Sequence, residues 1–156
     1  MHLNIMPIAN SSDTIDISSK NKTEDLANKI SKKLKLGDIV FLYGEIGVGK
    51  TTFVKYLINE FQRENNLNLT EVTSPTFSLL NEYQIKDIKI NHYDLFRLKS
   101  ADEVKNLDLF EDNQNVITLI EWPQFIQKKP KNLIEISFKY NDDHQKRSVK
   151  VKGVSL

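Results

Sequence analysis

Three of the five glycines in this chain of 156 residues fall within six consecutive positions, and a lysine and two threonines follow them directly. The segment reads Gly44-Glu45-Ile46-Gly47-Val48-Gly49-Lys50-Thr51-Thr52 and matches the pattern G-x-x-x-x-G-K-[ST]. Glycines allow the backbone to wrap inward, so that successive N–H groups converge on phosphate oxygens. In this pattern the lysine contacts the β- and γ-phosphates, and the hydroxyl after it binds Mg²⁺. The segment therefore predicts a nucleotide-binding loop over residues 44 to 52, with ATP and Mg²⁺ as cofactors.

The sequence on either side of the loop fits this prediction. Ile39–Tyr43 is an uninterrupted apolar run bounded by glycines, which is typical of a strand buried on both faces of a parallel sheet. After the loop, a helix is predicted from Lys50 to about Gln62, because apolar residues recur along one of its faces. The amino end of such a helix adds positive partial charge beside the bound phosphates.

The rest of the chain alternates predicted strands and helices. We expect strands at Thr14–Ile17, Phe77–Tyr83, Ile88–Tyr93 and Val116–Ile120, and a final antiparallel pair at Leu133–Tyr140 and Ser148–Val151. Capping patterns predict one helix that starts at Asn21 and another that runs from Ser100 to about Leu109. The predicted fold is therefore α/β, with a P-loop NTPase-like mixed, mostly parallel sheet flanked by helices. We expect one domain over residues 1–156, in which residues 1–13 form an N-terminal extension of unknown role.

Composition excludes several classes of protein. The 22 basic and 21 acidic side chains leave a net charge of +1, which argues against binding nucleic acid through bulk charge. The chain has no cysteine, so disulfide scaffolds, thiolate metal sites and cysteine nucleophiles are excluded. We find no secretory signal and no run approaching the roughly 20 apolar residues that cross a bilayer. We therefore expect a cytoplasmic protein without a membrane partner.

Two acidic residues at predicted strand ends are candidates to manage the metal. Glu121 and Asp94 each follow a predicted strand, and carboxylates at such ends are the usual additional Mg²⁺ ligands in this architecture. We assign metal contact to Thr51 and Glu121, and we expect Asp94 to orient the attacking water or to hold metal-bound water. Lys50, Asp94 and Glu121 are thus the predicted catalytic residues. The alternatives are a solvated strand end for Glu121 and a turn residue for Asp94. His92 is interpreted as a structural residue or a support for metal ligands, since no His or Cys partner is spaced for a transition metal.

Three hydroxyl side chains gather in the segment between the second helix and the next strand, which reads Thr73-Ser74-Pro75-Thr76-Phe77. Pro75 favours extended backbone at Ser74. The hydroxyls could reach a γ-phosphate or its metal, and Ser74 and Thr76 are the candidates for a nucleotide-sensing switch. The alternative is an ordinary loop of turn-forming residues.

Taken in succession, these segments resemble the TsaE (YjeE) family of small bacterial P-loop ATPases. The resemblance rests on residues 44–52, on the switch segment, on His92-Tyr93-Asp94-Leu95-Phe96-Arg97 and on Glu121-Trp122-Pro123, and it covers about Thr14 to Val151. The phosphate loop occurs in many families, whereas the other three segments in this order are far more specific. The chain departs from the family at Val48, where a smaller alanine is commoner, and at Phe96, where tyrosine is usual.

The resemblance implies a role in tRNA modification. Members of the family act with the proteins TsaB and TsaD to form threonylcarbamoyladenosine beside the anticodon of tRNAs that read codons beginning with A. TsaD transfers the threonylcarbamoyl group and the ATPase supports repeated turnover, so tRNA would be met only through that complex. For this chain the resemblance implies phosphate contacts from Lys50, metal contacts from Thr51 and Glu121, and help with hydrolysis from Asp94.

The resemblance also implies that two segments approach the nucleotide base, one before the first helix and one in a late turn. These correspond to Lys20–Thr23 and to Lys146-Arg147. The candidate base contacts are Lys20, Thr23 and Arg147.

Two other functions of a nucleotide-binding chain stay open. A small-molecule kinase usually has a second substrate pocket and a mobile lid with several arginines, but only Arg97 and Arg147 follow the loop. A binding module that senses ATP without hydrolysing it would use the same residues. A GTPase is disfavoured, because no N-K-x-D motif follows the loop. The scarcity of arginine also predicts slow hydrolysis by the isolated chain, since charge-stabilising arginines contribute about 10³–10⁵ in rate.

Overall fold

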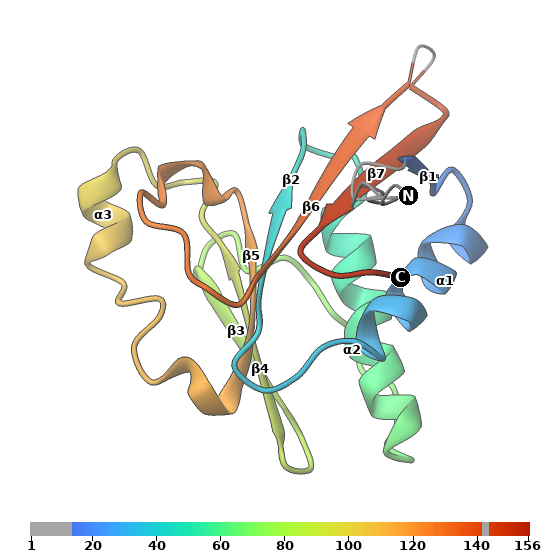
Figure 1. Ribbon diagram of the computed structural model, residues 1–156, viewed down its shortest axis with the longest axis horizontal. Coiled ribbons are helices and arrows are strands. Elements are labelled where there is room, and N and C mark those ends of the chain that lie inside the picture. The colour runs from blue at the N-terminus through green and yellow to red at the C-terminus, as the bar shows by residue number, and fades with distance from the viewer. Residues whose placement is uncertain (1–13, 142–143) are drawn as a thin grey trace, which may run out of the picture.

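The computed structural model describes residues 14–141 and 144–156, and the predicted extension over residues 1–13 lies outside them. In this described part, seven strands form one sheet in the order β1-β7-β6-β2-β5-β4-β3 (Figure 1). The strands are β1 (Thr14–Asp16), β2 (Ile39–Tyr43), β3 (Leu80–Ile85), β4 (Ile88–Asp94), β5 (Val116–Glu121), β6 (Leu133–Tyr140) and β7 (Arg147–Lys152). The α-helices are α1 (Lys20–Ser31), α2 (Lys50–Glu64) and α3 (Ala101–Lys105), and short 3₁₀ helices lie at Asn113–Asn115 and Pro123–Phe125.

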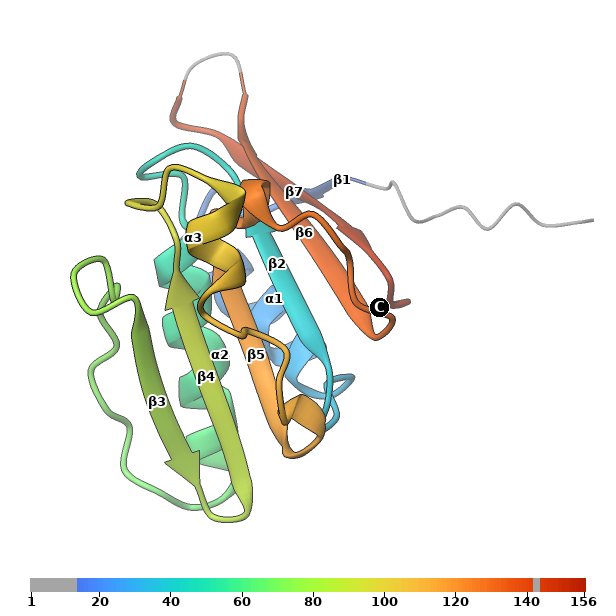
Figure 2. The same ribbon diagram turned by 90° about the vertical axis from the view of Figure 1, so that its left-hand side faces the viewer.

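Parallel strands form the centre of the sheet and antiparallel strands form its edges. β2 pairs in parallel with both β5 and β6, and β4 pairs in parallel with β5. The pairs β3–β4, β6–β7 and β1–β7 are antiparallel. Figure 2 shows β4, β5 and β2 side by side and running in the same direction. The predicted mixed α/β sheet with an antiparallel C-terminal pair is confirmed.

Two apolar clusters cover the two faces of the sheet. Helices α1 and α2 pack on each other against one face, where Ile30, Val40 and Leu57 belong to a single buried cluster (Figure 1). On the other face, α3 and the segments beside it cover a second cluster that includes Phe41 and Val104. Alternate residues of β2 therefore enter different cores, which is why its sequence is apolar without interruption.

Helix α1 begins earlier than the capping pattern predicted. Its N-cap is Ser19, whose side-chain oxygen accepts a hydrogen bond from the Lys22 N–H at 3.2 Å. Ser19 has extended backbone, with φ of −116°, and Asn21 lies inside the first turn. The prediction of a start at Asn21 was wrong because a second capping residue stands two positions upstream.

Two further boundaries differ from the prediction. β3 starts at Leu80, three residues later than expected, because Leu79 has a left-handed φ of 68° that extended backbone cannot continue through. α3 ends at Lys105 rather than near Leu109, and Asp108 follows with a left-handed φ of 49°. Within the described residues, no helix combines the length and the apolar character needed to cross a membrane.

Candidate functional site

The glycine-rich loop joins the carboxyl end of β2 to the amino end of α2, as the sequence predicted. Gly44 has a φ of 148°, and a Cβ there would lie 2.8 Å from Val48 Cγ1 and 2.9 Å from Phe138 Cβ. Only glycine fits this close approach. The Val48 side chain is fully buried in the core, so the valine at this position points into the protein and not into solvent.

Lys50 lies at the first helical position and is buried, with 4% of its surface exposed. Its ammonium donates to the carbonyl oxygens of Gly44 and Glu45, the latter at 3.1 Å, and its Nζ lies 3.9 Å from the centroid of the Trp122 ring. Burial lowers the pKa of Lys50, and the negative charges of Glu121, Asp94 and Glu45 oppose this shift. A buried cation held against the loop in this way is suited to meet phosphate oxygens.

Thr51 and Glu121 come together from α2 and β5. The Thr51 hydroxyl lies 3.1 Å from each carboxylate oxygen of Glu121, and Glu121 is 2% exposed. Glu121 Oε2 also lies 2.6 Å from Nε2 of His92, which is fully buried. A hydroxyl and a carboxylate are the hard oxygen donors that Mg²⁺ prefers. In the described part of the chain, no cluster of three or more His, Cys, Asp and Glu side chains could hold a metal by itself, so a metal here would also need nucleotide or water oxygens.

Asp94 ends β4 and contacts the predicted switch segment. Its Oδ2 accepts a hydrogen bond from Ser74 Oγ at 2.5 Å and another from Thr76 Oγ1 at 3.2 Å. Its Oδ1 accepts from the Phe96 N–H at 3.0 Å. Asp94 is 5% exposed. The structure therefore brings Asp94, Ser74 and Thr76 into one hydrogen-bonded group.

Arg97 also binds the predicted switch segment, through contacts that the sequence analysis did not predict. Its guanidinium donates to the backbone carbonyls of Thr76 and Phe77 and lies 5.7 Å from the centroid of the Phe77 ring. Phe77 itself is 86% exposed, so its ring contacts the Arg97 guanidinium at the surface rather than packing in a core. No local signal in the sequence indicates these long-range contacts to backbone carbonyls.

The C-terminal strand pair also reaches the phosphate loop. The Tyr140 hydroxyl, at the end of β6, donates to the Gly47 carbonyl at 2.7 Å. The Arg147 guanidinium lies 3.5 Å from the position that a Cβ would take at Gly49. No sequence pattern indicates Tyr140, and Arg147 was selected only through the family resemblance.

The other predicted base contacts lie at the start of α1. Lys20 is exposed in the first turn. Thr23 is buried, and its hydroxyl lies within hydrogen-bonding distance of the carbonyls of Ile17 and Ser19, at 3.3 and 3.2 Å. Thr52, the last residue of the predicted loop, is exposed.

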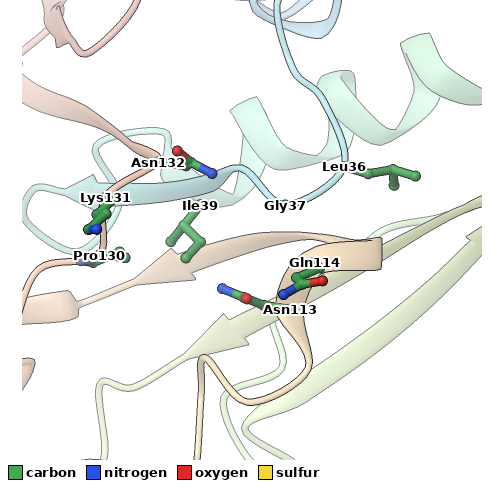
Figure 3. A pocket seen from close by; sticks show the side chains of 8 residues that line it. All are labelled: Leu36, Gly37, Ile39, Asn113, Gln114, Pro130, Lys131 and Asn132. Carbon is green, nitrogen blue, oxygen red and sulfur yellow. The ribbon is translucent and has the colours of Figure 1, made fainter.

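A separate pocket of about 400 Å³ lies at the opposite end of β2 (Figure 3). Its lining includes Gly37 and Ile39 at the amino end of β2, Asn113 before β5 and Asn132 before β6. None of the predicted site residues lines this pocket, whereas the glycine loop, Asp94 and Glu121 lie at the carboxyl ends of β2, β4 and β5.

Together, the loop between β2 and α2 and the acids at the ends of β4 and β5 define a P-loop fold protein. The fold matches that of a crystal structure of Bacillus subtilis YdiB, with a TM-score of 0.66 and 22% sequence identity over 92% of this chain and 86% of that one. The model of the family described as "Threonylcarbamoyl adenosine biosynthesis protein TsaE" matches residues 17–149. The chain therefore belongs to the TsaE family, and the predicted family resemblance is confirmed.

Curated relatives agree with this assignment. A "tRNA threonylcarbamoyladenosine biosynthesis protein TsaE" from Rickettsia bellii is 40% identical over 131 residues, which are 83% of this chain and 88% of the relative. Proteins of the same description from Aquifex aeolicus and Nostoc sp. are 35% and 31% identical, over 86% of this chain and 92% and 82% of the relatives.

Proposed function

We propose that this chain is a Mg²⁺-dependent ATP-binding protein that hydrolyses ATP slowly and supports a TsaB–TsaD complex in forming threonylcarbamoyladenosine on tRNA. The family assignment supports the pathway. The observation that carries the ATP-binding part is the contact between Thr51 and Glu121 directly beside the Lys50 loop. We place this work in the cytoplasm and expect tRNA to be met only through the partner complex.

Each part of the site has a role in this proposal. The amides of residues 44–50 and the Lys50 ammonium would bind the β- and γ-phosphates. Thr51 and Glu121 would hold Mg²⁺, which when bound would partly neutralise the negative charge of the phosphates. Asp94 would orient the attacking water, and its bonds to the switch hydroxyls would change when a γ-phosphate competes for Ser74 and Thr76.

Slow hydrolysis and partner dependence follow from the arginines near the site. Arg97 is bonded to the carbonyls of Thr76 and Phe77, and Arg147 lies beside Gly49 near the end of the loop. Among the described residues, neither guanidinium forms a hydrogen bond or an ion pair with Asp94 or Glu121. The chain would therefore depend on a partner to stabilise charge on the transferring phosphate.

Calorimetric titration with ATP and Mg²⁺ tests the binding part. Replacing Lys50 by alanine is expected to weaken binding by about 100-fold, because a charge-assisted contact to phosphate is lost. Lys55→Ala is the matched control, since Lys55 is exposed on the same helix, and it should bind normally. Unchanged ATP affinity in Lys50→Ala would overturn the assignment.

Phosphate release measured with and without purified TsaB and TsaD tests the partner-dependent part. We expect the isolated chain to turn over slowly and the mixture to turn over faster. Rapid hydrolysis by the chain alone, unaffected by either protein, would contradict the partnership while leaving ATP binding intact.

A further inference from the structure

His92 is the most deeply buried ionisable side chain near the candidate site, and the sequence left open whether it is purely structural or supports a metal ligand. It lies on β4, is fully buried, and places Nε2 at 2.6 Å from Glu121 Oε2. Its other ring nitrogen, Nδ1, is also buried and has no hydrogen-bond partner. Among the described residues, only Asn91 Oδ1 shares this lack of a partner.

An unpartnered buried nitrogen is unfavourable for folding, so packing alone would favour an apolar side chain at this position. The ring is retained with one nitrogen satisfied and one unsatisfied, and the satisfied nitrogen meets Glu121. Because a carboxylate can only accept hydrogen bonds, Nε2 must carry the proton in this contact. The ring therefore acts as a donor aimed at one oxygen of Glu121.

The strand register explains why a side chain of this length is needed. β4 and β5 are parallel, with Asp94 opposite Glu121 and His92 opposite Leu119. His92 thus reaches Glu121 across a diagonal of the strand pair, a separation that long side chains span and short ones do not. Asp94, directly opposite, points its carboxylate at Ser74 and Thr76 instead.

We propose that His92 is a positioning residue that fixes the Glu121 carboxylate for Mg²⁺. Its Nε2–H holds Oε2, so that the carboxylate cannot rotate away from Thr51, whose hydroxyl lies 3.1 Å from both of its oxygens. This inference rests on the proposed function, because it assumes that Thr51 and Glu121 hold Mg²⁺. Side chains that orient metal ligands in this way typically contribute 10- to 100-fold to metal affinity.

Two variants separate the N–H from the rest of the side chain. In His92→Gln, the amide nitrogen extends about as far as Nε2 and can still donate to Glu121. In His92→Asn, the amide nitrogen lies near the position of Nδ1 and cannot reach Glu121. Both replacements are polar and remove the ring, so they differ mainly in that one hydrogen bond.

The experiment measures ATP affinity in excess Mg²⁺ and in EDTA, and takes the ratio as the Mg²⁺ dependence of binding. For His92→Asn we expect a 10- to 100-fold loss of this ratio, with unchanged affinity in EDTA. For His92→Gln we expect a ratio within about threefold of the wild type. Thermal unfolding of the free variants reports whether each is folded, and His92→Leu, which fills the space with an apolar group, replaces His92→Asn if that variant unfolds.

Three outcomes would overturn the inference. Full Mg²⁺ dependence in His92→Asn would show that the hydrogen bond is not needed, and an equal loss in His92→Gln would show that the N–H is not the determining group. Equal losses of affinity in Mg²⁺ and in EDTA would indicate a purely structural histidine. The wild-type measurement is independent of these, because a wild-type chain that binds ATP equally with and without Mg²⁺ would contradict the proposed function itself.

Discussion

Asp94 and Glu121 occupy the last positions of two neighbouring parallel strands and lie directly opposite each other, yet their carboxylates contact different residues. Glu121 contacts Thr51 on α2, whereas Asp94 accepts hydrogen bonds from Ser74 and Thr76. Of this side-by-side pair of buried acids, one thus contacts the proposed metal ligand Thr51 and the other contacts the proposed switch segment.

This division predicts opposite effects of two isosteric changes. Glu121→Gln should lose the Mg²⁺ dependence of ATP binding, because an amide is a poor ligand for Mg²⁺. Asp94→Asn should keep that dependence and lose hydrolysis, since a neutral amide orients a water molecule less strongly than a carboxylate does. Calorimetry and phosphate release on the same two preparations check both statements. If Asp94→Asn lost metal dependence and Glu121→Gln kept full turnover, the two roles would have to be exchanged.

The switch segment should loosen when its bonds to Asp94 are removed. Ser74→Ala is expected to increase amide hydrogen exchange across residues 73–78 more than Thr76→Val does, because the Ser74 bond is the shorter, at 2.5 Å against 3.2 Å. Ser78→Ala is the control, since Ser78 is exposed and its hydroxyl reaches only the Leu80 carbonyl at 3.4 Å. Equal exchange in all three variants would show that Asp94 does not restrain the segment.

ATP binding should weaken at alkaline pH. Burial lowers the pKa of Lys50 below its ordinary value of 10.5, and phosphate binding requires the charged form. Between this lowered pKa and the higher pKa that Lys50 has beside bound phosphates, binding must take up a proton, so affinity falls as the pH rises.

Titrations in buffers of different ionisation enthalpy would detect this proton uptake. Lys50→Arg keeps its charge throughout the range, and its affinity, even if weaker, should not vary with pH. A wild-type affinity that is constant across the window would contradict the prediction.

A methyl group at Gly44 should destabilise the fold. In Gly44→Ala the new Cβ would lie under 3.0 Å from both Val48 and Phe138, and we expect a loss of roughly 2–4 kcal/mol in the free energy of unfolding. In Gly37→Ala, φ is also positive, at 97°, but the nearest atom is the Gln114 carbonyl oxygen at 3.5 Å. That variant should lose only about 1 kcal/mol. Urea unfolding distinguishes them, and equal losses would mean that backbone strain alone matters at Gly44.

Much of the architecture was predictable because its signals are local. The buried strands β2 and β5 appear as apolar runs, the loop has a fixed glycine spacing, and the antiparallel pair of β6 and β7 follows from two alternating segments around a polar turn. Asp94 and Glu121 could be placed at one edge because parallel strands end together.

The rest could not be predicted because it depends on contacts between distant segments. The backbone contacts of Arg97, the bond from Tyr140 to Gly47 and the Trp122 ring under Lys50 each join residues that lie far apart along the chain. The left-handed backbone at Leu79, which makes β3 start later than predicted, is likewise not indicated by the residues around it in the sequence. Such features can be predicted only when the order of the strands in the sheet is known.

That order has a consequence for how the protein is made. β2 has β5 and β6 as its two neighbours, and both follow it by more than seventy residues. A nascent chain that has emerged only as far as α3 would carry the glycine loop on a strand with no hydrogen-bonded neighbour. If the loop binds nucleotide as proposed, it would acquire its place in the sheet only late in translation, after β5 and β6 have left the ribosome.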